Sequence, residues 1–219
     1  MSSATITTSA RLINSTPQTE EQAMVRKVAV SSFLGNFIEW FDYASYSYFA
    51  TTIALVFFPT DNHTVAMLQT FGVFALSFIL RPIGALFWGS YGDKKGRKAA
   101  LAHSIMFMSG ASFLIGCLPS YSVIGVGAPI LLLLLRMVQG FSASGEYAGA
   151  ATFLGEYAPT SKRGIYCSLI PASTAIGLLA GSTLATLMTA NMNSSAMVGW
   201  GWRVPFLLAG PLGLIVLYI

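Results

Sequence analysis

Residues 81–101, which read RPIGALFWGSYGDKKGRKAAL, organise our interpretation of the whole chain. An apolar run that contains Arg81 ends in small residues, a dense cluster of charges follows, and a second apolar run begins at Ala99. A short cationic loop between two apolar runs is typical of the cytoplasmic side of a hairpin of membrane helices. The cluster contains one anion, Asp93, for which we expect a cationic partner close by. Its cations are Lys94, Lys95, Arg97 and Lys98.

The composition indicates an integral membrane protein. Of the 219 residues, 54% are hydrophobic and only 9% are charged, whereas soluble domains carry about 25% charged residues. The net charge of +4 is explained by basic loops, so a nucleic-acid-binding function is not required. The Cys and His residues show no metal-ligand spacing, and no nucleophile–base pair is apparent. We therefore predict no metal site, no cofactor and no enzyme activity.

Six apolar runs follow a polar N-terminal segment. Residues 1–24 are rich in Ser and Thr and have little to bury, so we expect a flexible cytoplasmic tail. We expect residues 25–219 to form one bundle of six transmembrane helices, because each run is long enough to cross a bilayer. The predicted helices are 27–58, 64–90, 97–118, 128–157, 164–190 and 202–219.

The distribution of cations predicts how this bundle is oriented. The loops on one side contain none, apart from Arg203 at the start of the last helix. An excess of Lys and Arg marks the cytoplasmic side, which puts the N-terminus of this multi-pass chain in the cytoplasm. The cations that fall on that side are Arg11, Arg26, Lys27, Lys94, Lys95, Arg97, Lys98, Lys162 and Arg163.

Residues 89–101 resemble the loop between helices two and three of the major facilitator superfamily of transporters. That pattern reads Gly-x-Leu-Ala-Asp-Arg-x-Gly-Arg-Lys-x-x-Leu. Members have twelve helices in two similar halves, so the resemblance implies an all-α membrane protein and makes this chain the N-terminal half of such a fold, either a fragment or a truncated product. The matching residues are Gly89, Asp93, Gly96, Arg97, Lys98 and Leu101, and the departures are Tyr91, Gly92 and Lys94.

Five ionisable residues lie inside the predicted helices. Such a residue costs at least about 2.5–3.5 kcal/mol at bilayer depth, so it is expected to face the interior of the bundle and to be functional. They are Glu39, Asp42, Arg81, Arg136 and Glu146.

Two of these charges are neighbours on the first helix. Glu39 and Asp42 are three residues apart on one helical face, and Tyr43 follows Glu39 at i+4. Two close carboxylates resist ionising together, which suits a proton carrier. Alternatively, one carboxylate pairs with an arginine and only holds helices together.

The fourth predicted helix contains a second stretch that resembles the superfamily. Arg136 begins an Arg-x-x-Gln-Gly sequence, and in relatives this arginine is associated with proton coupling. The alternative is a structural partner for Asp42 or Glu146. We expect Glu146 near the middle of the membrane, where a solute binds. Small residues around these positions permit close helix packing or line a cavity.

The inner end of this helix predicts a gate. Glu156 and Arg163 have the Glu-x6-Arg spacing of related porters. Together with the signature loop they are expected to form a charge network that closes the cytoplasmic face in one conformation. The alternative is simple anchoring of the loop. The predicted gate consists of Gly89, Asp93, Gly96, Arg97, Glu156 and Arg163.

Several stretches together are more specific than the superfamily. They are GNFIEWFDY at 35–43, RPIG at 81–84, QGFSASGEY at 139–147, EYAP at 156–159 and GWRVPF at 201–206. They resemble the metabolite:proton symporter family, which includes carriers of proline and glycine betaine, 2-oxoglutarate, citrate and shikimate. One departure is Ser144, where many relatives have Gly.

The resemblance implies proton-coupled symport of a small polar metabolite across the inner (plasma) membrane by alternating access. An osmolyte such as proline or glycine betaine is expected. The alternatives are symport of an organic acid of the 2-oxoglutarate or citrate type, or a truncated membrane half that does not transport by itself. The implied partners are the metabolite, the proton, the lipid bilayer and a C-terminal six-helix half.

Overall fold

The structure is a computed structural model that describes residues 16–218, with side chains from residue 23 onward except at 146–148, 152, 153, 157 and 217. All regular structure in this part of the chain is helical. The elements are α2 (Thr16–Tyr48), α3 (Ala50–Phe57), α4 (His63–Ile79), α5 (Arg81–Lys95), α6 (Arg97–Cys117), α7 (Tyr121–Ile124), α8 (Gly127–Tyr157), α9 (Arg163–Asn191), α10 (Ser194–Gly199), the 3-10 helix η1 (Gly201–Arg203) and α11 (Val204–Tyr218).

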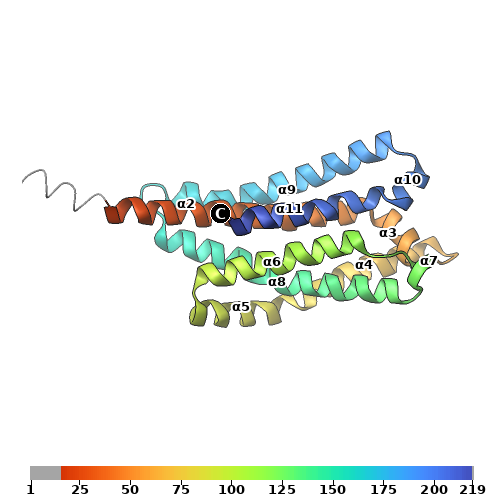
Figure 1. The fold of residues 1–219 in the computed structure, drawn as a ribbon, viewed down its shortest axis with the longest axis horizontal. Helices are drawn as coiled ribbons and strands as arrows, with labels where there is room; N and C mark the ends of the chain where they lie inside the picture. The colour runs from red at the N-terminus through yellow and green to blue at the C-terminus, as the bar shows by residue number, and fades with distance from the viewer. Residues whose placement is uncertain (1–15, 219) are drawn as a thin grey trace, which may run out of the picture.

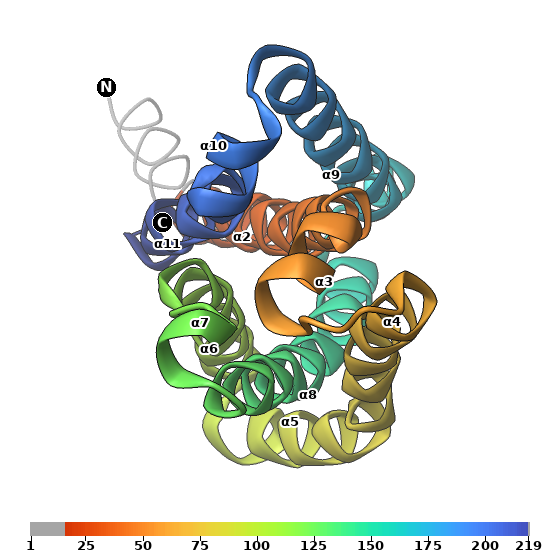
Figure 2. The ribbon, with the colours of Figure 1, turned by 90° about the vertical axis from the view of Figure 1, so that its right-hand side faces the viewer.

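The long helices lie side by side in one elongated bundle (Figure 1). Helix α2 packs against α9, α11 and α8, while α8 also packs against α6, α5 and α4. Viewed along the bundle, α2 lies between α11 and α9, and α6 and α8 lie below it (Figure 2). Because α2 and α8 each pack against several helices, their side chains Glu39, Asp42 and Arg136 are buried inside the bundle.

Two of the predicted helices are broken in the structure. The predicted helix 27–58 is formed by α2 and α3, which meet at Phe49. The predicted helix 64–90 is formed by α4 and α5, which meet at Leu80, and Pro82 stands in the first turn of α5. Proline has no N–H group and cannot continue the hydrogen-bond ladder of α4. The break therefore falls directly beside Arg81.

The boundaries of the other predicted helices agree with α6, α8, α9 and α11 to within a few residues. At the N-terminus, however, α2 begins at Thr16, so 16–24 of the expected tail are helical. Residues 1–15 of that tail lie outside the described residues. The structure also has α7 and α10 within segments that were expected to be outer loops or turns.

The charged cluster at residues 93–98 is more helical than expected. Helix α5 continues through Lys95, and α6 begins at Arg97. Gly96 alone forms the turn, with a φ of 96° that side chains with a Cβ rarely adopt. The predicted loop is thus a one-residue turn, because a glycine at this position reverses the chain without further residues.

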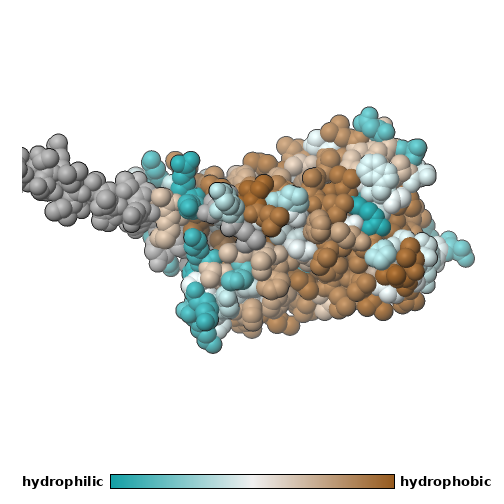
Figure 3. Space-filling view, in the orientation of Figure 1, coloured by the Kyte–Doolittle hydropathy of each residue, from teal (hydrophilic) through white to brown (hydrophobic). Residues whose placement is uncertain are grey.

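Four helical segments of the described chain are long and apolar enough to cross a membrane. They are His63–Lys95, Arg97–Cys117, Gly127–Glu156 and Arg163–Asn191, and Gly201–Val216 is a shorter apolar helix. Large hydrophobic side chains are exposed along the bundle, for example Leu86 on α5 and Leu68 on α4. Figure 3 shows this apolar surface between two ends that carry the hydrophilic residues. Such a surface is expected to face lipid.

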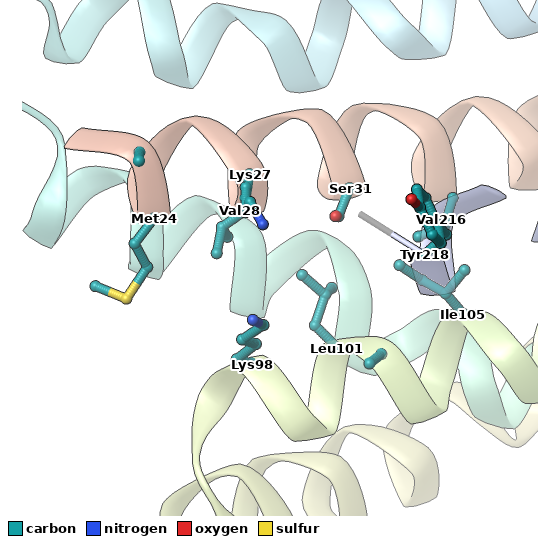
Figure 4. Close-up of a pocket in the computed structure, with 11 residues that line it drawn as sticks. Met24, Lys27, Val28, Ser31, Lys98, Leu101, Ile105, Val216 and Tyr218 are labelled. Atoms are coloured by element: carbon teal, nitrogen blue, oxygen red, sulfur yellow. The ribbon is translucent and has the colours of Figure 1, made fainter. Parts of the chain in front are cut away.

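The two ends differ in charge. We call the end that contains residues 93–98 and 159–163 the basic end. Here a cavity of about 490 Å³ opens between α2, α6 and α11. Lys27 and Lys98 point toward each other across it (Figure 4). Glu39, Asp42, Arg81 and Arg136 are not among the residues that line this cavity.

Candidate functional site

Each of the two carboxylates of α2 is paired with a different arginine. Asp42 pairs with Arg136 of α8, and Glu39 pairs with Arg81 of α5. We call Asp42–Arg136 the buried pair and Glu39–Arg81 the half-exposed pair. The name of the second pair refers to Arg81, whose side chain is 30% exposed, whereas that of Arg136 is only 1% exposed.

The buried pair connects three helices. Asp42 Oδ2 accepts a hydrogen bond from Arg136 Nη1. Its other oxygen, Oδ1, accepts from Ser112 Oγ of α6 at 3.1 Å and from Gln139 Nε2 of α8 at 3.2 Å. Gln139 also donates to Ser112. One carboxylate thus joins α2, α6 and α8 through charge-assisted hydrogen bonds, which are stronger than bonds between neutral groups.

Aromatic rings enclose the guanidinium of Arg136. Its central carbon lies 3.9 Å from the ring centroid of Tyr46 and 5.5 Å from that of Phe206. The Tyr46 hydroxyl donates to the Thr70 carbonyl oxygen at 2.9 Å, which fixes the ring between α2 and α4. Arg136 Nε and Nη2 have no hydrogen-bond partner among the described residues. Asp42 therefore supplies the negative charge that offsets this desolvated cation.

The half-exposed pair is built differently. Arg81 Nη2 donates to Glu39 Oε1 and to the Tyr43 hydroxyl, so one nitrogen contacts both side chains. Glu39 itself is buried, and the guanidinium carbon of Arg81 lies 4.7 Å from the ring centroid of Phe78. Arg81 is also the first residue of α5, directly after the break at Leu80. A carboxylate, a guanidinium and aromatic faces therefore meet where α4 joins α5, and the guanidinium is partly exposed.

These contacts show which predicted residues come together. The expected neighbours Glu39 and Asp42 diverge toward separate arginines, so each carboxylate has its own counter-charge. From the sequence, pairing of one carboxylate with an arginine was given as an alternative. In the structure, both Glu39 and Asp42 make such a pair. Arg136 contacts Asp42, and the side chain of Glu146 lies outside the described residues.

Sequence reasoning left the roles of three participants unassigned. Arg81 was recognised as an intramembrane charge, but no role was assigned to it, and Ser112 and Gln139 were not assigned to the site. Counting opposite charges in the helices would have suggested a partner for Arg81. No pattern in the sequence points to Ser112, because a single Ser in an apolar helix commonly bonds to its own backbone.

Helix α9 is held against α2 by a third polar cluster. Asn36 Nδ2 lies 2.8 Å from Ser173 Oγ, 2.8 Å from Thr174 Oγ1 and 3.0 Å from the Ile170 carbonyl oxygen. Trp40 Nε1 donates to Asn36 Oδ1 at 3.2 Å. These bonds lie beside Pro171, which interrupts the backbone ladder inside α9. Asn36 therefore fixes the position of α9 next to the carboxylates of α2.

Of the predicted gate residues, the structure pairs Asp93 with Arg97. Their side chains are 2.7 Å apart in an i,i+4 arrangement, and both are exposed. Glu156 and Arg163 are exposed at the same basic end, and among the described side chains no ion pair joins them to each other or to the first pair. Gly96 forms the turn, and a Cβ at Gly89 would meet open space. This conformation thus contains part of the predicted network.

The described residues thus form a bundle with membrane-length helices and two arginine–carboxylate pairs between them. The Sugar (and other) transporter family matches residues 27–219, and the chain belongs to this family. The fold is that of the major facilitator superfamily. The structure of the proton:xylose symporter XylE has a TM-score of 0.77 at 16% identity over 90% of this chain and 44% of that one. An inward-open structure of XylE from E. coli has a TM-score of 0.74.

The chain is also similar to curated osmolyte transporters. It is 43% identical over 199 residues to the glycine betaine/proline/ectoine/pipecolic acid transporter OusA of Dickeya dadantii, covering 91% of this chain and 40% of that protein. It is 42% identical to the proline/betaine transporter of Escherichia coli K12 over the same shares. A putative proline/betaine transporter of Staphylococcus aureus is 43% identical over 195 residues, covering 89% of this chain and 42% of that protein. The chain therefore spans about two fifths of the length of these relatives. These findings confirm the predicted superfamily and helical fold.

Proposed function

We propose that the chain forms one half of a secondary active transporter that carries a small polar osmolyte together with a proton. Proline or glycine betaine is the proposed solute, because proteins named for these solutes are 42–43% identical to most of the chain. Transport occurs by alternating access between this half and a C-terminal six-helix half, with the solute between them.

The observation that carries this proposal is the buried Asp42–Arg136 pair. An ion pair inside a membrane bundle is expensive, and retaining one is characteristic of proton relays. In our proposal Asp42 exchanges the proton, Arg136 stabilises its ionised form, and Ser112 and Gln139 orient the carboxylate. Glu39, Tyr43 and Glu146 complete the solute and proton path.

The bundle is proposed to lie in the inner (plasma) membrane with its N-terminus in the cytoplasm. The concentration of Lys and Arg at the basic end supports this orientation, because cytoplasmic loops carry an excess of both. In this orientation Gly89, Asp93, Gly96, Arg97, Glu156 and Arg163 form the cytoplasmic gate. The Asp93–Arg97 contact supports it, and Glu156 and Arg163 join the network in another conformation.

An uptake experiment tests the proposed function. The chain is produced in a transporter-deficient strain, first by itself and then with a C-terminal six-helix half of a proline/betaine transporter. Labelled proline, glycine betaine, 2-oxoglutarate and citrate are offered with and without an uncoupler. We expect proline or glycine betaine to enter only with both halves, and the uncoupler to abolish accumulation.

Two results contradict this proposal in different ways. Uptake of 2-oxoglutarate or citrate instead of the osmolytes favours the organic-acid alternative. Absence of all uptake, while immunoblots show both halves in the membrane fraction, means that the chain does not transport these solutes. Asp42→Asn sharpens the test, because it should abolish proton-driven accumulation when uptake is expressed per amount of protein that immunoblots show in the membrane.

A further inference from the structure

The half-exposed pair is open to a ligand on one side. The side chain of Arg81 is 30% exposed, while its partner Glu39 is only 4% exposed. In the buried pair both side chains are inaccessible: the exposed fraction is 1% for Arg136 and 4% for Asp42. A solute that approaches the described half can therefore reach the guanidinium of Arg81 without unpacking the bundle. It reaches Glu39 only when Arg81 moves.

The backbone permits this movement. Arg81 is at the start of α5, after the break at Leu80, and Pro82 follows it. Leu80 keeps a right-handed helical conformation, so α4 and α5 form one interrupted span. An element end of this kind absorbs changes in φ and ψ more easily than the inside of a continuous helix. Arg136, in contrast, is nine residues inside the continuous helix α8.

The surroundings of Arg81 already accommodate a cation. Its guanidinium carbon lies 4.7 Å from the ring centroid of Phe78 and 5.5 Å from that of Tyr43. Aromatic faces attract ammonium groups as well as guanidinium groups, and quaternary ammonium ligands are recognised in this way. When Arg81 moves outward, these faces and the Glu39 carboxylate are available to a second cation.

We propose that a zwitterionic solute inserts into the Glu39–Arg81 pair and that this exchange of partners selects zwitterions over singly charged solutes. The solute carboxylate binds Arg81, and its ammonium group binds Glu39 and the faces of Tyr43 and Phe78. The inference rests on the proposed function and assigns the solute-recognising role to Arg81. Every charge of the pair has a partner before and after insertion.

Solutes with one charge cannot complete the exchange. An anion that takes Arg81 leaves the buried carboxylate of Glu39 without a counter-charge. A cation that takes Glu39 leaves Arg81 without one. Removing the partner of the buried Glu39 is strongly unfavourable, which discriminates against anions. The penalty for a cation is smaller, because the side chain of Arg81 is 30% exposed. Dicarboxylates such as 2-oxoglutarate are excluded as well, because both of their charges are negative and neither can replace Arg81 beside Glu39.

Isosteres of glycine betaine test this exchange. The compound 3,3-dimethylbutyrate has the same shape and carboxylate but lacks the ammonium charge, whereas choline has the ammonium group and lacks the carboxylate. Each competes with labelled glycine betaine in counterflow, which requires no proton gradient. The protein is this chain together with the C-terminal half used above. We expect 3,3-dimethylbutyrate to compete at least about tenfold less well than unlabelled glycine betaine, and choline to compete less well by a smaller factor.

Two substitutions should weaken this preference, each in favour of a different isostere. Glu39→Gln removes the carboxylate that competes for Arg81, so 3,3-dimethylbutyrate should compete about as well as glycine betaine. Arg81→Gln leaves Glu39 free, so choline should gain instead. The matched controls Asp61→Asn and Lys162→Gln remove exposed charges away from the pair and should leave the preference unchanged.

The double variant Glu39→Gln/Arg81→Gln covers the case in which a single variant does not reach the membrane. It keeps the pair neutral and should recognise glycine betaine no better than either isostere. If the variants that reach the membrane retain the preference of the unaltered chain, the exchange is wrong while the proposed transport function stands. If the unaltered chain exchanges no glycine betaine or proline, the proposed function fails and this inference fails with it.

Discussion

The two ion pairs start from the same helix, three residues apart, yet their surroundings differ. Asp42 meets an arginine in the middle of a continuous helix, enclosed by Tyr46 and Phe206. Glu39 meets Arg81, which lies where α4 joins α5. The side chain of Arg81 is partly exposed, whereas that of Glu39 is buried. In our proposals, identical chemistry serves two purposes. The first pair holds helices together and exchanges a proton, and the second admits the solute.

The largest expected effect comes from breaking the buried pair. Asp42→Ala leaves Arg136 desolvated and without a counter-charge, which should lower the free energy of unfolding by about 3–5 kcal/mol. The measurement is unfolding by SDS titration of the purified chain in mixed micelles. Adding Arg136→Met removes the orphaned charge and should recover most of this loss. A loss below about 1 kcal/mol for the single variant would contradict the closed environment described for this pair.

The close approach of α4 and α8 supports both pairs, since α8 carries Arg136 and α4 leads to Arg81. A Cβ added at Gly140 would collide with the backbone of Ser77. Gly140→Ala should therefore destabilise the chain by about 1–3 kcal/mol through overpacking. The same titration measures it.

Gly110→Ala provides the matched control for this prediction. A Cβ at Gly110 meets nothing within 4 Å, and the residue lies inside α6. Alanine is preferred to glycine in a helix by about 0.5–1 kcal/mol, so this variant should be neutral or slightly stabilising. Equal effects at both glycines would mean that α4 and α8 do not approach as closely as described.

Breaking the half-exposed pair should cost less. Glu39→Ala should lower the free energy of unfolding by about 1–2 kcal/mol, because Arg81 can turn toward water when its partner is removed. The comparison with Asp42→Ala in the same titration is the decisive measurement. If Glu39→Ala cost as much as Asp42→Ala, the difference in environment between the pairs would have no energetic consequence.

The smallest effect is expected at the basic end. Asp93→Asn removes an exposed i,i+4 ion pair with Arg97, which should change stability by at most about 0.5 kcal/mol. Salt should reduce even this difference, because exposed charges are screened. Unfolding at low and high salt checks both points. A loss above about 1 kcal/mol would indicate that Asp93 has further partners in the folded chain.

Much of the fold could be predicted from the sequence. The apolar runs and the charged cluster at 93–98 predicted the helices and the hairpin, because membrane helices need long apolar segments and a lipid-exposed backbone must satisfy its own hydrogen bonds. The breaks at Phe49 and Leu80 were not predicted. Pro82 was visible, but a proline in a membrane helix can also be accommodated without a separate second helix.

The candidate site was only partly predictable. The helical spacing placed Glu39, Asp42 and Tyr43 near one face, and the cost of buried charge singled out Arg81 and Arg136. Which arginine each carboxylate contacts depends on how α5 and α8 are rotated about their axes. That rotation follows from contacts between distant residues, such as Gly140 with Ser77 and Gly145 with Trp88.

The sequence by itself determined that this is a helical membrane protein with resemblance to a transporter superfamily and with charges inside its helices. These properties depend on local composition and spacing, which a chain carries in any conformation. Only the tertiary structure decided that the charges form two pairs, one closed and one partly exposed at its arginine. Pairing and exposure arise from the packing of helices that are distant in the chain, and no local pattern specifies them.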